Sequence, residues 1–293
     1  MKMCSGRSKT NYKGNKISIS KHTISIRGLK NDLLIAVIAD LHDRNPDSVI
    51  SSVKNYNPDL ILLPGDTFER RDSNIAGFDK SEMDRWMNSS KLWRVLCKSI
   101  KIFSDVTGIT EKKSKEYSIN YGRRLLAELT KVAPCVMSVG NHEWYFLEDD
   151  YSFLKTHNVS LLDNQNCKID IHGQTINFGG LSTRYNFEWL KSFSNIGGIK
   201  ILLCHHPEYY VRYIKGKKSD TFDLVVSGHA HGGQWRIFNQ GMFAPGQGLF
   251  PRYTKGRYGK MIVSAGLSNT AFFPRFFNPM EVVLIRVQGK GNY

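Results

Sequence analysis

The sequence has no hydrophobic run long enough to cross a bilayer, and its N-terminus lacks the apolar core of a secretory signal. Cysteine is also scarce: there are five, an odd number with no paired spacing, and three of them lie in apolar runs. This usage is typical of reduced thiols in a reducing compartment. We therefore expect a soluble, cytoplasmic protein whose 293 residues form one large domain or two small ones.

Acidic residues are absent from residues 1–31, which hold eight of the chain's 41 Lys and Arg residues. The whole chain carries a formal charge of +15. Residues 1–30 are expected to form a basic N-terminal arm with the first strand or strands, and three environments suit this arm: water, an anionic lipid surface or nucleic acid. The chain contains no recognisable nucleic-acid module, so its charge predicts non-specific attraction only.

Two kinds of apolar pattern predict strands. Ile17, Ile19, Ile24 and Ile26 alternate with polar residues, which indicates half-buried strands arranged as a hairpin. Short continuous apolar runs predict interior strands, and their alternation with helical segments is typical of a parallel α/β sheet. These runs cover residues 33–39, 59–63, 134–139, 199–204 and 224–226, with helices expected over 45–56 and 147–157. Further strands are expected within 159–181, 234–238, 261–265 and 281–287.

Five of the apolar runs end in side chains that offer oxygen or nitrogen to a metal. His229 and His231 stand two residues apart, so in extended backbone they face the same side, and Asp40 and His42 repeat this spacing. Such residues occur singly in ordinary loops, but the ends of parallel strands meet at one edge of a sheet, so we expect these five clusters to converge. The candidate ligands are Asp40, His42, Asp66, Asn141, His142, His205, His229 and His231.

The candidate ligands are oxygen and nitrogen donors without thiolate, which favours Mn, Fe or Zn over a structural zinc knot. Asp66 follows a glycine at a strand end, and it has two interpretations. One is a turn aspartate. The other is a bridging ligand, because the two oxygens of a carboxylate can hold two cations roughly 3.5 to 4 Å apart.

Residues 70–131 interrupt the alternation with a charged segment that has no strand-like run. Apolar residues recur at helical spacing between Met83 and Phe103 and between Tyr121 and Val132, so we expect a helical insertion packed beside the core. Its tryptophan and methionine content also suits a lid over an apolar substrate or a contact with a membrane surface.

The polar blocks at the strand ends, taken in order, resemble the signature motifs of the calcineurin-like metallophosphoesterases. They read Asp40-Leu-His42, Gly65-Asp66, Gly140-Asn-His-Glu143, His205 and Gly228-His-Ala-His231. The resemblance makes residues 31–293, apart from the insertion, one metallophosphoesterase domain. It implies an α/β fold, a four-layer αββα sandwich, that holds two divalent metal ions (Mn, Fe or Zn). One ion would be held by Asp40, His42, Asp66 and His231, and the other by Asp66, Asn141, His205 and His229.

The chemistry that the resemblance implies is attack of metal-activated water on a phosphoester. Two dications lower the pKa of a bridging water and screen the charge of the phosphate. His142 would not be a ligand but the general acid for the leaving group. Asp43 or Glu143 would orient its imidazole. Cys204 is interpreted as a core residue, and His206 is not included in the site.

Within the family, the chain resembles the small bacterial phosphodiesterase branch that includes YaeI and YkuE. The similar stretches are residues 228–234, 245–258, 263–266 and Asn278-Pro-Met-Glu281. We therefore expect a phosphodiesterase or pyrophosphatase with a lipid-linked or nucleotide-containing phosphate-ester substrate. The same branch implies a peripheral contact with the membrane.

Two other functions are compatible with the sequence. A phosphoprotein phosphatase is one, since Gly65-Asp66-Thr-Phe-Glu-Arg70 and Glu143 resemble protein serine/threonine phosphatases, in which an arginine after this motif grips the phosphate. The other is a metal-binding interaction scaffold or nucleic-acid binder with vestigial hydrolysis. The complete set of expected ligands argues against the second.

Overall fold

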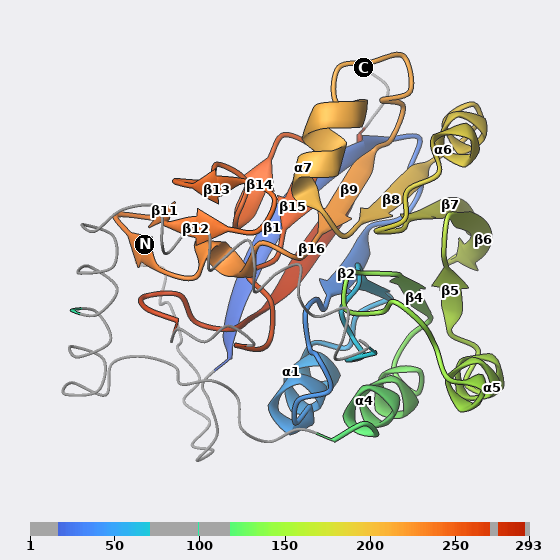
Figure 1. The fold of residues 1–293 in the computed structure, drawn as a ribbon. Coiled ribbons are helices and arrows are strands. Elements are labelled where there is room, and N and C mark those ends of the chain that lie inside the picture. Colours follow the sequence, from blue (N-terminus) through green and yellow to red (C-terminus); the bar gives the residue numbers. More distant parts are fainter. Residues whose placement is uncertain (1–16, 71–98, 100–117, 270–274, 291–293) are drawn as a thin grey trace, which may run out of the picture.

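The computed structural model of the chain describes residues 17–70, 99, 118–269 and 275–290. In this part of the chain two six-stranded sheets stack face to face, and helices cover both outer faces (Figure 1). None of the helices in the described ranges has the length and apolar character needed to span a membrane. The three cysteines in these ranges, Cys135, Cys167 and Cys204, are free thiols, as the sequence predicts.

The first sheet has the strand order β1-β16-β2-β3-β4-β5, and all neighbours are parallel except β16 and β2. The strands are β1 (Ser18–Arg27), β2 (Leu33–Val37), β3 (Leu60–Leu63), β4 (Cys135–Ser138), β5 (Ser160–Leu162) and β16 (Glu281–Lys290). All four residues of β3 are buried, as expected for an apolar strand covered on both faces.

The second sheet has the order β14-β15-β9-β8-β7-β6, with antiparallel pairs only at its two edges. Its strands are β6 (Gln165–Ile171), β7 (Gln174–Leu181), β8 (Lys200–Cys204), β9 (Leu224–Ser227), β14 (Gly256–Tyr258) and β15 (Met261–Val263). Two short hairpins follow β9. They are β10 (Arg236–Ile237) with β11 (Gln240–Gly241), and β12 (Phe243–Ala244) with β13 (Gly248–Leu249).

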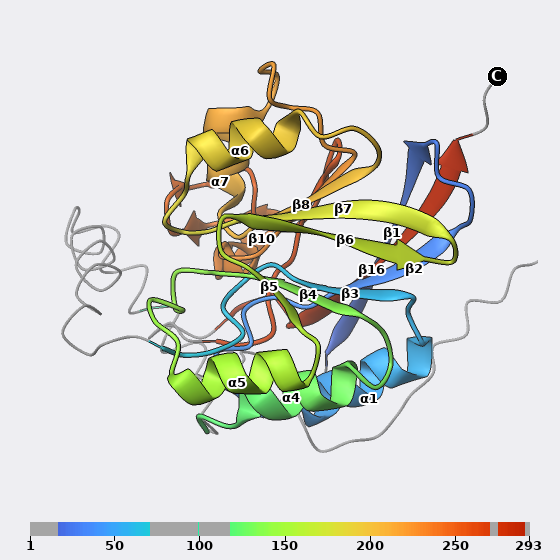
Figure 2. The same cartoon turned by 90° about the vertical axis from the view of Figure 1, so that its right-hand side faces the viewer.

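Helices cover both outer faces of the stacked sheets. Figure 2 shows one helical layer below the sheets, made of α1 (Asp47–Tyr56), α4 (Tyr121–Leu129) and α5 (Glu148–Thr156). The layer above contains α6 (Phe187–Ser194) and α7 (Pro207–Tyr209), which continues into the π-helix η1 (Tyr210–Ile214). A single 3-10 turn, η2 (His231–Gly233), follows β9.

Three apolar cores lie between these layers. Ile35 and Val136 of the first sheet meet Phe178 and Val226 of the second in the core between the sheets. A second core joins the first sheet to α1, α4 and α5, and a third joins the second sheet to α6, α7 and η1. The predicted four-layer αββα sandwich is therefore confirmed.

The predicted hairpin within residues 17–26 is wrong. β1 is one continuous strand that pairs in parallel with β16. Ile24 and Ile26 are buried between the sheets, whereas Ile17 and Ile19 pack against the core under the helices. The apolar alternation changes face within a single strand, because one end of β1 is covered by the second sheet and the other by the helical layer.

The helix predicted from Tyr121 is α4, which lies beside α1 and forms part of the crossover between β3 and β4 (Figure 2). Leu125 and Leu126 are buried in the core against the first sheet. The helices predicted between Met83 and Phe103 fall outside the described residues, apart from position 99. The extent of the insertion therefore stays a prediction.

Replacing Phe178 with alanine is expected to destabilise the protein by about 3 to 5 kcal/mol, because the fully buried ring leaves a cavity between the sheets. Urea unfolding followed by circular dichroism measures the change. Phe238→Ala is the matched control: that side chain is fully exposed, so the expected change is within about 0.5 kcal/mol. A Phe178→Ala protein as stable as the wild type would contradict the core between the sheets.

Candidate metal centre

Five strand ends bring the predicted ligands to one place. β2, β3 and β4 of the first sheet and β8 and β9 of the second each end just before one of the polar blocks. Groups of these side chains hold their ligand atoms within 4.8 Å of one another, and hydrogen bonds link Asn141 to the same cluster. The structure therefore gathers all seven predicted ligands: Asp40, His42, Asp66, Asn141, His205, His229 and His231.

The backbone at these positions is unusual. Asp40, His42, Asp66, His229 and His231 have φ angles of 57°, 54°, 55°, 65° and 43°, in the left-handed region that residues with a Cβ rarely occupy. Such conformations persist only where the surrounding structure fixes them, and they cluster at functional sites. The turns after β2, β3 and β9 are therefore shaped to aim side chains rather than simply to reverse the chain.

Asp40, His42 and His231 form the first group of ligands. Their ligand atoms lie within 4.8 Å of one another, and the two imidazole rings stack with centroids 5.4 Å apart. Asp40 and His42 are fully buried. Asp40 Oδ1 accepts a hydrogen bond of 2.9 Å from the backbone N–H of His229, which ties the turn after β2 to the turn after β9.

Asn141, His205 and His229 form the second group. The side-chain oxygen of Asn141 lies 2.9 Å from His205 Nε2 and 2.8 Å from His229 Nδ1. His205 Nδ1 lies 2.9 Å from the carbonyl oxygen of Pro64 and donates a hydrogen bond to it, so Nε2 carries the lone pair when the ring is neutral. An oxygen and two nitrogens are thus within reach of one ion.

Asp66 lies between the two groups. Its Oδ1 accepts the backbone N–H of His142 at 2.8 Å. Its Oδ2 lies 3.6 Å from Nε2 of His42 in the first group and 3.1 Å from Nε2 of His205 in the second. The side chain is buried. Of the two interpretations that the sequence left open, this position favours the bridging ligand.

Unpartnered buried atoms show that the cluster fits cations. Within the described residues, Asp40 Oδ2 and His42 Nε2 are buried and have no hydrogen-bond partner, and Asp66 Oδ2 has none besides its 3.1 Å contact with His205 Nε2. A buried polar atom without a partner costs free energy, and carboxylate and imidazole are ordinary ligands of divalent cations. Glycine keeps the space open: a Cβ at Gly228 or Gly266 would lie 2.9 or 2.7 Å from Asp40 Oδ2.

The charge states of the imidazoles are set by burial and by Asp66. Burial lowers the pKa of His229 and of His231 well below the ordinary value, so both rings are neutral, which is the form that binds a metal. Burial also lowers the pKa of His205, but the neighbouring Asp66 carboxylate outweighs it and raises the pKa to about 9. A metal bound at His205 must therefore displace a proton.

Glu69, rather than Asp43 or Glu143, binds the imidazole of His142. Its two oxygens lie 2.7 Å from His142 Nδ1 and 3.0 Å from His42 Nδ1. Burial raises the pKa of Glu69, but the hydrogen bonds with these two rings lower it by more. The pKa of Glu69 therefore falls well below the ordinary value. One carboxylate therefore orients both rings, with Nε2 of each facing the centre.

The two acids that the sequence offered as partners of His142 have other roles, so that expectation is wrong. Asp43 accepts the backbone N–H of Gly122 at 2.8 Å and pairs with a buried arginine. Glu143 holds the turns after β3 and β4 together, because it accepts backbone N–H groups from both at 2.8 to 3.1 Å. Their donors are Asp66, Thr67, Phe68 and Gly140.

Arg70 does not face the ligand cluster as a phosphate-gripping arginine would. Its guanidinium is buried and lies 2.6 Å from Asp43 and 2.8 Å from Asp150. It also donates a hydrogen bond of 3.2 Å to the carbonyl oxygen of Ile119. Two carboxylates thus neutralise the charge that a phosphatase would use on its substrate, and the side chain links the site to α5.

His206, which was not expected in the site, lies beside the second group, and its ligand atom is within 4.8 Å of those of His205 and His229. The His206 ring centroid is 4.0 Å from that of His229, and His206 Nδ1 is 3.1 Å from Glu208 Oε1. Glu208 is buried, with Oε1 3.9 Å from His229 Nε2. The only signal in the sequence was proximity to His205. Cys204 is fully buried, as expected of a core residue.

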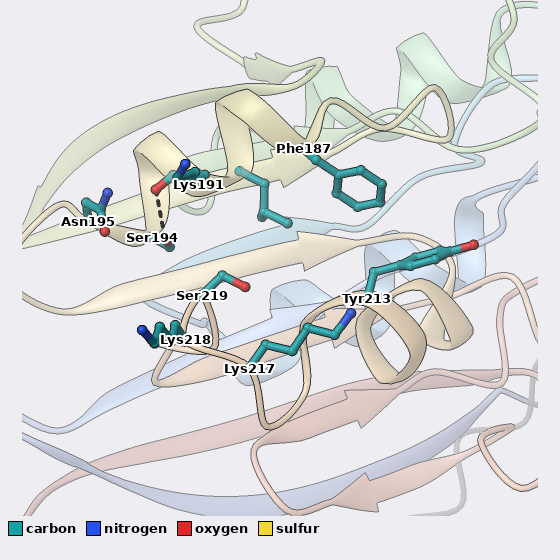
Figure 3. Close-up of a pocket in the computed structure, with 9 residues that line it drawn as sticks. Phe187, Lys191, Ser194, Asn195, Tyr213, Lys217, Lys218 and Ser219 are labelled. Carbon is teal, nitrogen blue, oxygen red and sulfur yellow. Dashed lines mark hydrogen bonds between the residues drawn. The ribbon is translucent and has the colours of Figure 1, made fainter.

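A cavity of about 520 Å³ lies apart from the ligand cluster, between α6 and the chain that follows η1 (Figure 3). None of the predicted ligands lines it. Its lining residues are Phe187, Leu190, Lys191, Ser194, Asn195, Tyr213, Lys217, Lys218 and Ser219. This cavity is therefore not part of the candidate metal centre.

A four-layer α/β sandwich with carboxylate, amide and imidazole side chains gathered at its strand ends is an arrangement typical of metal-dependent hydrolases. The family model described as calcineurin-like phosphoesterase matches residues 33–233, which is more than half of the chain. The protein belongs to this family. The resemblance drawn from the strand-end motifs is thus confirmed at the level of the family.

Two of the similar proteins are named as metallophosphoesterases. The chain is 27% identical over 283 residues to an uncharacterized metallophosphoesterase, Cj0846, of Campylobacter jejuni, an alignment that covers 91% of this chain but only 62% of that protein. It is 30% identical over 189 residues to an uncharacterized metallophosphoesterase of Aquifex aeolicus, covering 60% of this chain and 69% of the relative. Bacillus subtilis YpbG is 24% identical over 240 residues, covering 80% and 73%. These relatives do not confirm the predicted branch.

Glu69→Gln is expected to lower kcat about 10- to 100-fold, because a glutamine has one acceptor oxygen where two imidazoles need one each. Hydrolysis of bis(p-nitrophenyl) phosphate at saturating Mn²⁺ measures the effect. Glu148→Gln is the matched control, since Glu148 is exposed at the start of α5. Equal turnover by the Glu69 variant and the control would show that Glu69 does not position the rings.

Affinity for Mn²⁺ is expected to fall as the pH drops below about 9, because the His205 proton must leave before that ring binds metal. The fall is at most about tenfold per pH unit for one proton, and it levels off at higher pH. Isothermal titration calorimetry at neutral pH, repeated in buffers of different ionisation enthalpy, counts the protons released. Binding without proton release would contradict the charge state given to His205.

Proposed function

We propose that the protein is a binuclear-metal-dependent phosphoesterase that acts as a phosphodiesterase or pyrophosphatase. The observation that carries the proposal is the position of Asp66, whose buried Oδ2 lies between His42 of one ligand group and His205 of the other. A carboxylate shared in this way suits two cations roughly 3.5 to 4 Å apart, the spacing of two-metal phosphoesterases.

The seven ligands divide between the two cations, with Mn, Fe or Zn fitting the mixed oxygen and nitrogen donors. When bound, such a pair polarises the phosphoryl oxygens and supplies a water of lowered pKa. Asp40, His42, Asp66 and His231 would hold one cation, and Asp66, Asn141, His205 and His229 would hold the other.

His142 is the general acid in this proposal. Glu69 holds its Nδ1, and its Nε2 lies 4.0 Å from Asp66 Oδ2, so the second nitrogen faces the ligands. Burial and the neighbouring His42 lower the pKa of His142 more than Asp66 and Glu69 raise it, so the neutral ring is favoured and the protonated ring is a stronger acid than a free imidazolium. Its task is to transfer a proton from Nε2 to the leaving oxygen.

One contact supports a diester rather than a phosphoprotein as the substrate. A phosphomonoester carries one more negative charge than a diester, and the arginine that would meet that charge, Arg70, is already neutralised by Asp43 and Asp150. In keeping with the branch that the sequence resembles, the proposal includes a lipid-linked or nucleotide-containing substrate. It also includes a cytoplasmic location with peripheral contact at the membrane.

Mn²⁺-dependent hydrolysis of bis(p-nitrophenyl) phosphate tests the proposal. The wild type is expected to turn over, whereas Asp66→Asn, which removes the shared charge, is expected to lose activity by about 10³-fold or more. His142→Ala is expected to lose about 10²- to 10⁴-fold, the usual contribution of a general acid. Asp47→Asn, an exposed aspartate on α1, is the matched control.

Three results would contradict the proposal. Equal rates for the wild type and Asp66→Asn would mean that the hydrolysis does not use this centre. No metal-dependent turnover by the wild type would favour an interaction scaffold or nucleic-acid binder. Faster hydrolysis of phosphopeptides than of the diester would favour a phosphoprotein phosphatase instead.

A further inference from the structure

Large apolar side chains are exposed on the two hairpins after β9 and in the loop before β16. Phe238 is fully exposed, and Phe277 and Phe250 are exposed to 65% and 60%. Ile237 and Leu249 are each exposed to 42%. Single exposed apolar residues are ordinary, but a group of five in short neighbouring segments marks a contact surface. We call these five residues the hairpin patch.

The segments that carry the hairpin patch are bound to one another. The backbone N–H of Phe250 donates to the carbonyl oxygen of Met242 at 3.0 Å, which joins the end of β13 to the start of β12. The Gln240 side chain donates to the Pro251 carbonyl oxygen at 2.8 Å, which joins the two hairpins. The N–H of Arg236 donates to the carbonyl oxygen of Phe276 at 3.0 Å. Strands β11, β12 and β13 accordingly lie together at one end of the molecule (Figure 1).

The chain around the hairpin patch is free of negative charge. Residues 224–280 contain six Lys and Arg residues and no Asp or Glu. Arg252, two residues after Phe250, is exposed. Carboxylates from outside this stretch pair with two of the six basic residues, Lys255 with Glu281 at 2.7 Å and Lys260 with Asp220 at 2.9 Å, and Arg275 is buried. The stretch therefore combines exposed apolar side chains with two exposed basic ones, Arg252 and Arg257, and has no acidic residue of its own.

We propose that the hairpin patch docks the protein on the surface of an anionic lipid bilayer. Apolar side chains at a tight turn, such as Phe238 between β10 and β11, can enter the boundary between headgroups and acyl chains without burying a sheet edge. Basic residues at the same surface attract anionic headgroups. A second copy of this chain is a poorer occupant, since a symmetric pair would bring two acid-free surfaces face to face.

Docking in this way would bring the metal centre to the bilayer surface. The hairpins pack on the turn that holds His231, where the backbone N–H of Met242 donates to the carbonyl oxygen of Gly233 at 3.0 Å. This consequence rests on the proposed function, because it gives the centre access to phosphoesters at headgroup depth. The docking itself is independent of hydrolysis, so its failure would remove the membrane contact and leave the proposed hydrolysis of phosphoesters standing.

Co-sedimentation of the full chain with vesicles tests the docking. The wild type is expected to bind vesicles of phosphatidylcholine mixed with phosphatidylglycerol, and to bind phosphatidylcholine alone more weakly. Phe238→Ser with Phe250→Ser is expected to lower the partition coefficient about tenfold or more, because two inserted rings are lost while every basic residue is kept. Tyr151→Ser, at an exposed aromatic of α5, is the matched control and should bind like the wild type.

Turnover of a soluble diester by the double variant reports its folding and is expected to be unchanged. Vesicle binding by the double variant equal to that of the wild type would overturn the proposal. It would assign the attraction to basic residues elsewhere in the chain. Absence of binding by the wild type would overturn it as well. Sedimentation velocity tests self-association. A wild type that is dimeric and a double variant that is monomeric would assign the hairpin patch to self-association and not to lipid.

Discussion

The structure depends on the neutralisation of a buried carboxylate, that of Asp66. A carboxylate removed from water must be compensated by hydrogen bonds or by positive charge. One oxygen of Asp66 is satisfied by a backbone N–H, and the other lies among imidazoles that come from different strands. Those imidazoles hold the pKa of Asp66 well below the ordinary value despite its burial. The charge therefore stays at the position where cations are needed.

The two stacked sheets allow this arrangement because neither sheet carries all the ligands. The first sheet supplies Asp40, His42, Asp66 and Asn141, and the second supplies His205, His229 and His231. The two sets meet through specific contacts, such as the one from the His229 backbone to Asp40 and those from Asn141 to the two imidazoles of the second group. Stacking of the sheets, which Phe178 and the core around it maintain, is therefore a condition for the metal centre.

Much of the fold and of the ligand set can be predicted from the sequence, because both follow one rule. An apolar run that is buried on both faces ends abruptly in polar residues, and parallel strands present such ends at one edge. β3 with Asp66 and β9 with His229 follow this rule. β1 does not follow it, because one end of the strand is covered by the second sheet and the other end by the helical layer. The apolar alternation therefore shifts by one residue within the strand, which resembles the pattern of two strands joined by a turn.

The partner of His142 could not be predicted because it depends on contacts between turns rather than on spacing within one. Asp43 and Glu143 are near in the sequence to proposed ligands, but their carboxylates face backbone N–H groups of neighbouring turns. Glu69, three residues after Asp66, reaches His142 only because the turns after β3 and β4 lie together. The same holds for Arg70, whose motif resembles that of a phosphatase but whose carboxylate partners come from distant segments.

A crystal structure of the Mn²⁺-soaked protein, with anomalous difference maps recorded at the manganese edge, tests the central claim most directly. The expected result is two peaks about 3.5 to 4 Å apart, with Asp66 between them. A single peak, or two peaks of which Asp66 touches only one, would contradict the account of this carboxylate as the shared ligand.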